Sequence, residues 1–263
     1  MTTPEQVLCA KDSIYETNAV LVTCMLRDVR LVRADLPQIA LHRDALASGR
    51  MLPVGSVEYV REAMRVAGIA EPANLSYHPS IRPLLMREVR GCTVSELLDT
   101  GCHSHVFVKP QATKLFTGFV LKADLPLVEY DAHDQEQLKA LRAAPGTQPL
   151  WVSPIIDFAS EWRYYVMDGA IVGHSRYDPD GQDDAPPPDF CFVTAACETA
   201  WQVLQHPFAL DIGVLNGSGW NLVVELNDAW AIGLYNDGAE SLSSADYLRF
   251  LFSRWESLHK EMQ

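Results

Sequence analysis

The chain has 263 residues, of which 48% are hydrophobic, so it can bury a large core and is somewhat long for one compact domain. Its formal net charge of −13 argues against a broad nucleic-acid surface, because phosphate binding requires clustered Lys and Arg. No apolar run is long enough to span a bilayer, no signal-peptide pattern opens the chain, and its six cysteines form no Cys-x-x-Cys pair. These features predict a cytoplasmic protein with reduced thiols and no membrane contact.

The N-terminal part of the chain has the pattern of a small α/β unit. Residues 29–34 alternate as a strand does, and residues 53–69 give a short strand followed by an amphipathic helix. Ser56 is a typical helix N-cap, and Gly68 is a typical helix stop. The proline-containing segment 70–83 predicts a linker or a crossing between domains.

From about residue 105 the pattern changes to strands with inserted helices. Strands are expected at residues 105–110, 118–123, 150–158 and 161–178. The last of these should fold back at Asp168-Gly169, a dipeptide typical of tight hairpin turns. Helices are expected at residues 134–144, 191–206 and 243–262.

Two polar residues interrupt an apolar strand in the segment WNLVVELNDAW. Glu225 and Asn227 lie two positions apart, so their side chains share one face of the strand. A half-exposed edge strand is one explanation of this pair. The other is a site for Mg²⁺, which prefers carboxylate and carbonyl oxygens.

A second carboxylate can reach the same face. Asp211 lies on the preceding apolar stretch, and the turn NGSG between the two stretches predicts a hairpin that can place Asp211 beside Glu225. Two carboxylates that close repel each other and raise each other's pKa. A divalent cation would remove the conflict.

Three basic residues are candidates for binding an anion. Lys109 and Lys114 lie on either side of a short turn and could grip a polyphosphate, although each could also be an ordinary solvated lysine. Arg163 lies mid-strand among aromatic residues, where an unpaired guanidinium is costly. It therefore needs a phosphate or carboxylate partner, and Glu161 is a candidate within the chain.

The order of these motifs resembles an ATP-grasp domain. The motifs are a strand Lys (FVKP), a second Lys (ATKLFTG), a hinge strand (LWVSPII), an Arg strand (EWRYYVMDGAIVG) and an Asp fourteen residues before Glu-x-Asn (DIGVLNGSGWNLVVELN). Within that family the chain is most similar to the clade named for one Arg and two Lys, suspected to contain peptide or protein ligases. The resemblance implies an α+β ATP-grasp fold at residues 81–263, preceded by a small α/β pre-grasp domain at residues 1–80.

The resemblance also implies roles for individual residues. Lys109 and Lys114 would contact ATP phosphates, and the backbone of Trp151, Val152 and Ser153 would meet adenine. Arg163 would face the transferred phosphoryl group or the substrate carboxylate, which with Lys114 makes it a catalytic candidate. Asp211, Glu225 and Asn227 would hold Mg²⁺ and complete the nucleotide site. Many relatives carry an acidic residue in the hinge for the ribose hydroxyls; Ser153 stands there in this chain, so Asp157 or Glu161 could take that role.

The implied activity is an ATP- and Mg²⁺-dependent carboxylate–amine ligase that acts through an acylphosphate. Its partners would be ATP, an amine acceptor, and a carboxylate on a small molecule, peptide or protein. Such chemistry depends on positioning and charge neutralisation. One alternative is an ATP-binding assembly factor without ligase turnover, because a eukaryotic assembly factor for a translation initiation complex resembles the same clade. Another is an interaction protein with a decayed site.

Overall fold

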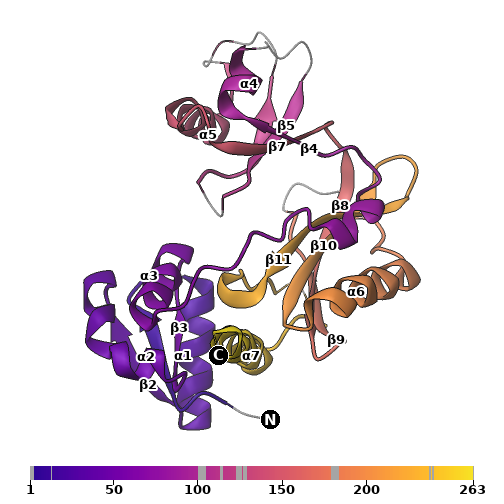
Figure 1. Ribbon diagram of the computed structural model, residues 1–263. Helices are drawn as coiled ribbons and strands as arrows, with labels where there is room; N and C mark the ends of the chain where they lie inside the picture. Colours follow the sequence, from indigo (N-terminus) through magenta and orange to yellow (C-terminus); the bar gives the residue numbers. More distant parts are fainter. Residues whose placement is uncertain are drawn as a thin grey trace. The chain divides into compact units, whose positions relative to one another are not determined.

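The computed structural model describes residues 3–12, 14–99, 105–112, 115–122, 126, 129–178, 184–236, 238 and 240–262. The chain forms two compact units (Figure 1). The first joins Met1–Leu84 to Phe158–Gln263, and the second is the continuous segment Leu85–Asp157.

The N-terminal part of the first unit is a parallel three-stranded sheet with strand order β2-β1-β3. Its elements are β1 (Gln6–Ala10), α1 (Tyr15–Arg27), β2 (Arg30–Ala34), η1 (Leu36–His42), α2 (Arg43–Ala47), β3 (Met51–Val54), α3 (Val57–Ala67) and η2 (Pro79–Leu85). The predicted caps of α3 are confirmed: the Ser56 side chain accepts a hydrogen bond from the backbone N of Tyr59, and Gly68 has a φ of 81°. The segment expected to be a linker contains the start of η2.

The C-terminal part of the same unit is an antiparallel sheet with strand order β11-β10-β8-β9. Its elements are β8 (Phe158–Met167), β9 (Ala170–Arg176), α6 (Phe190–Leu204), β10 (Phe208–Leu215), β11 (Asn221–Asp228), η4 (Ala229–Ala231) and α7 (Ser244–Glu261). Asp168 and Gly169 have φ angles of 53° and 76°, so the predicted tight turn between β8 and β9 is confirmed.

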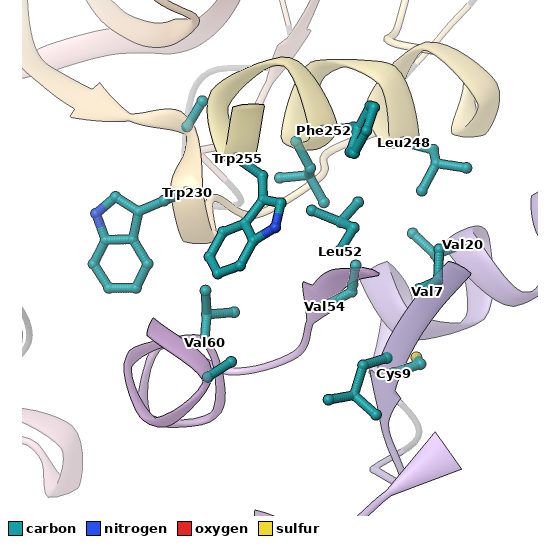
Figure 2. Close-up of a cluster of buried hydrophobic side chains, with 14 of the residues drawn as sticks. Val7, Cys9, Val20, Leu52, Val54, Val60, Trp230, Leu248, Phe252 and Trp255 are labelled. Atoms are coloured by element: carbon teal, nitrogen blue, oxygen red, sulfur yellow. The ribbon is translucent and has the colours of Figure 1, made fainter. Parts of the chain in front are cut away.

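One apolar core joins the two parts of this unit (Figure 2). It combines residues of β1, β3, α1 and α3 with the buried face of α7, which includes Leu248, Leu251, Trp255 and Leu258. Phe250 of α7 also meets the ring of Tyr165 on β8 edge to face, at 5.6 Å between centroids. The C-terminal helix therefore completes the core of the N-terminal sheet.

The second unit is an antiparallel sheet with strand order β4-β7-β5-β6. Its elements are β4 (Arg90–Thr93), α4 (Val94–Asp99), β5 (Val106–Pro110), β6 (Phe119–Leu121), α5 (Ala132–Ala143) and β7 (Pro149–Ser153). Val108 and Val152 bury one sheet face against Leu138 and Leu141 of α5. The strand expected at 150–158 was wrong in length, because β7 ends at Ser153 before Pro154, which has no backbone N–H to donate.

In the part of the chain that the structure describes, no helix is long and apolar enough to cross a membrane.

Candidate functional site

Three neighbouring strands bring four polar side chains to one face of the antiparallel sheet of the first unit. Asp211 on β10 lies directly opposite Arg163 on β8 and directly opposite Glu225 on β11. Asn227 is two residues beyond Glu225, so it shares this face. The predicted pairing of Asp211 with Glu225 is confirmed.

A β-bulge in β11 makes this pairing possible. Ile212 lies opposite Val223 while Asp211 lies opposite Glu225, so Val224 is an extra residue on β11. Without the extra residue Val224 would lie opposite Asp211, and alternation would send the Glu225 side chain to the other face.

Asp211 is at the centre of the hydrogen bonds in this cluster. Its carboxylate accepts from Nε and Nη2 of Arg163, both at 2.7 Å, and from Nδ2 of Asn227 at 2.9 Å. The same Nδ2 lies 3.3 Å from Oε1 of Glu225, so one amide bridges two carboxylates. Asp211 is 0% exposed and Arg163 is 7% exposed. Burial alone would lower the pKa of Arg163, but Asp211 raises it well above its usual value, so the guanidinium stays charged.

Two tyrosines that the sequence analysis did not single out flank Arg163. Its guanidinium carbon lies 5.3 Å from the ring centroid of Tyr177 and 5.1 Å from that of Tyr235, and these two rings stack on each other. Tyr177 follows the end of β9, where alternation along the strand places it near Glu161 and Arg163. For Tyr235, which follows η4 in an irregular segment, the sequence carries no local signal.

One nitrogen of the Arg163 guanidinium is not bound by Asp211. Nε and Nη2 are taken by Asp211, and within the described part of the chain no residue accepts a hydrogen bond from Nη1. Gly233 lies beside this nitrogen, and a Cβ at Gly233 would stand 3.7 Å from it. An anion could therefore bind at Nη1 while Arg163 keeps both bonds to Asp211.

Glu161 lies on the same strand face and does not pair with Arg163. Its carboxylate accepts a 2.6 Å hydrogen bond from the hydroxyl of Tyr177. Burial raises the pKa of Glu161 above 4.5; the Tyr177 hydrogen bond lowers it, and the charges of Asp211, Asp178 and Glu225 raise it again. The net direction is upward, so folding favours the protonated form of Glu161.

This pKa shift predicts a pH-dependent effect of Glu161→Gln on stability. The protonated carboxyl contributes stability below the unfolded-state value near 4.5, and that contribution is lost as the pH rises through the higher folded-state pKa. Gln stays neutral, so the difference between the unfolding midpoints, variant minus parent, should increase as the pH rises from about 4 to 8. Thermal unfolding across this range measures the gap, and a gap that is independent of pH would contradict the assignment.

The donor set of Asp211, Glu225 and Asn227 fits Mg²⁺. Two carboxylates and an amide are hard oxygen ligands, and protein sites for Mg²⁺ commonly use one or two carboxylates together with substrate phosphates. The set contains only two acidic residues, and among the described residues no group of three or more His, Cys, Asp or Glu could hold a metal ion. In the structure Nδ2 of Asn227 faces the two carboxylates, so this amide would have to turn over to present Oδ1 to a cation. A bound cation would share Asp211 with Arg163.

The second unit carries Lys109, Trp151, Val152 and Ser153 on its own sheet. Lys109 on β5 lies directly opposite Trp151 on β7, on the face away from the α5 core. Val152 points into that core, so only its backbone could meet a ligand. The hydroxyl of the buried Ser153 donates to the carbonyl of Pro154 at 3.1 Å. Lys114 lies outside the described residues.

Several solved structures are similar to this chain over most or all of its length. D-alanine–D-alanine ligase from Bacillus anthracis, complexed with ATP, matches over 100% of both chains with a TM-score of 0.58 and 13% identity. The RimK domain ATP-grasp protein from Sphaerobacter thermophilus matches over 94% of this chain and 99% of its own, with a TM-score of 0.56 and 16% identity. N5-carboxyaminoimidazole synthetase from Staphylococcus aureus, complexed with ADP, matches over 96% and 78%, with a TM-score of 0.56 and 9% identity. These likenesses confirm the ATP-grasp fold.

The sequence itself places the chain in one family of this fold. The model of the ATP-grasp domain from the second family of the clade named for one Arg and two Lys matches residues 84–245, more than half of the chain, so the protein belongs to that family. This confirms the resemblance drawn from the motifs. A comparison with curated protein sequences found no match.

Proposed function

We propose that this protein is an ATP- and Mg²⁺-dependent ligase that joins a carboxylate to an amine through an acylphosphate. The observation that carries the proposal is the cluster of Arg163, Asp211, Glu225 and Asn227 on one sheet face. It combines a cation-binding oxygen set with a buried, permanently charged guanidinium. Membership of an ATP-grasp family and the fold shared with a D-alanine–D-alanine ligase support the same chemistry.

Each predicted residue has a role in this proposal. Lys109 and Lys114 bind the phosphates of ATP, and the backbone of Trp151, Val152 and Ser153 meets the adenine. Asp211, Glu225 and Asn227 hold Mg²⁺, which neutralises charge on the phosphate oxygens when it is bound. Arg163 presents Nη1 to the transferred phosphoryl group or to the substrate carboxylate, while its other edge stays fixed on Asp211.

The proposed reaction has two steps. A carboxylate oxygen of the first substrate attacks the γ-phosphorus, and the bond to the β-phosphate oxygen breaks, so ADP leaves with the electron pair. The amine nitrogen then attacks the acyl carbon, phosphate leaves with the C–O electron pair, and the nitrogen loses a proton. We propose a peptide, protein or small-molecule carboxylate as the first substrate.

Coupled turnover tests the proposed function. Purified protein with ATP and Mg²⁺ is expected to release ADP and phosphate only when a pool of peptide carboxylates and an amine are both supplied, and mass spectrometry should detect the amide product.

Loss of one charge-assisted phosphate contact in Lys109→Ala should weaken ATP binding by roughly 10- to 100-fold with an unchanged unfolding midpoint.

Two results would count against the ligase. ATP binding without ADP release in any substrate combination would favour an ATP-binding assembly factor. Equal ATP affinity in the parent and in Lys109→Ala would remove Lys109 from the nucleotide site.

A further inference from the structure

A buried arginine on the C-terminal helix binds Asp228, the residue that follows Asn227 in the chain, and has no part in the function proposed above. Arg254 of α7 is 1% exposed, and the family match ends at residue 245, before this residue. A guanidinium is retained in such a place only when its donors are satisfied, because burying an unpaired charge costs several kcal/mol. The partners of Arg254 therefore show what holds it there.

Asp228 takes one whole edge of this guanidinium. Nε and Nη2 of Arg254 donate to Oδ1 and Oδ2 of Asp228, both at 2.7 Å, a geometry that fixes orientation as well as distance. Nη1 donates to Ser257 and Glu261 on the same helix. Asp228 also accepts from the backbone N of Trp230 and so caps η4.

Asp228 is the last residue of β11 and follows Asn227 directly. Beyond the bulge, only Glu225–Asp228 of β11 pair with Phe208–Asp211 of β10. This short ladder is bounded by the bulge at one end and by η4 at the other. Arg254 thus binds the last residue of the segment that carries both Glu225 and Asn227, and the carbonyl of Ser76 accepts a hydrogen bond from the backbone N of Leu226 within the same segment.

We propose that Arg254 is a positioning residue for the cation site: through Asp228 it holds the end of β11, and thereby sets the placement of Glu225 and Asn227. This inference rests on the proposed function. The positioning role adds a residue of the C-terminal helix, which lies beyond the matched ATP-grasp segment, to those that determine the geometry of the site. Residues that hydrogen-bond directly to metal ligands typically change metal affinity about 10- to 100-fold when they are altered, and because Arg254 acts through Asp228 we expect an effect near the lower end of that range.

The test is cation affinity in a conservative variant. Arg254→Lys keeps the charge and most of the volume but cannot form two parallel bonds to Asp228. Mn²⁺ binding, followed by electron paramagnetic resonance with ADP present, should weaken about tenfold or more. Amide hydrogen exchange at residues 225–228 should quicken, whereas exchange in β1 should not.

Two further variants separate positioning from general stability. Arg249→Lys is the matched control, because Arg249 is on the same helix in a more exposed ion pair with Asp246, and parent affinity for Mn²⁺ is expected. Asp228→Asn keeps an oxygen that can cap η4 but weakens the two hydrogen bonds with Arg254. It should therefore reproduce the loss of Mn²⁺ affinity expected for Arg254→Lys, even if the lysine variant unfolds. Arg254→Lys and Asp228→Asn combined should lose no more than either alone.

The outcomes distinguish this inference from the proposed function. Asn227→Ala should abolish the Mn²⁺ site; parent-like Mn²⁺ binding in that variant would overturn both the proposed site and the positioning role. A site that depends on Asn227 but is unchanged in both Arg254→Lys and Asp228→Asn would overturn the positioning role alone.

Discussion

Replacing Asp211 with Ala is expected to lower the free energy of unfolding by about 3–5 kcal/mol, the usual cost of removing one partner of a buried ion pair. The substitution leaves the guanidinium of Arg163, which is 7% exposed, without its two 2.7 Å bonds. Urea unfolding measures the loss. In the double variant Arg163→Met with Asp211→Ala, part of the stability should return, because no uncompensated charge remains.

The matched control for Asp211→Ala is an exposed ion pair. Lys139 and Glu136 have side chains 53% and 67% exposed, so Glu136→Gln should change stability by less than about 1 kcal/mol. If Asp211→Ala costs no more than this control, the buried pair does not contribute to the stability of the sheet.

Arg163→Lys is expected to keep ATP affinity near the parent value and to reduce acceptor-dependent ADP release on the order of 10²- to 10³-fold. The three N–H groups of a lysine ammonium diverge from a single nitrogen, so they cannot make two parallel bonds to Asp211 and also place a donor where Nη1 of Arg163 lies. Interactions that form mainly in the transition state lower turnover rather than ground-state binding. Steady-state kinetics and nucleotide titration together measure the two effects.

Arg176→Lys is the control for this prediction. Arg176 also forms a two-bond ion pair, with Asp178, close to the same sheet, and near-parent turnover is expected. Loss of ATP binding in Arg163→Lys would make Arg163 a nucleotide anchor. Unchanged turnover would make it a structural partner of Asp211.

Short sequence signals were sufficient to predict caps and turns, because their geometry depends only on neighbouring residues. The Ser56 cap, the Gly68 stop and the Asp168-Gly169 turn each act within a few positions, and all three are present. In contrast, α1 was not predicted. Its N-cap is Ile14, which makes no side-chain capping bond, and its Val and Thr residues are poor helix formers. Packing in the core shared with α7 stabilises this helix, and sequence periodicity does not show that contact.

The geometry of the candidate site depends on two irregularities that no short motif encodes. Counting back from the NGSG turn without the bulge pairs Asp211 with Val224, so the observed pairing with Glu225 needs the extra residue. A similar register shift between Tyr165 and Val166 sets which residues of β9 lie opposite β8. For Arg163 the nearest acid in sequence is Glu161, but the partner is Asp211, 48 residues away. Strand register, rather than sequence distance, decides which charges meet.

The core shared by the two ends of the first unit has a consequence for synthesis on the ribosome. Residues of β1 and β3 are made before the whole second unit and the antiparallel sheet, but Leu248 and Trp255, which cover them, are made after both. The emerging chain must therefore carry this apolar surface until α7 has been made, a state that is prone to aggregation and is a typical substrate of chaperones. The second unit is continuous in sequence, so its own core can close much earlier.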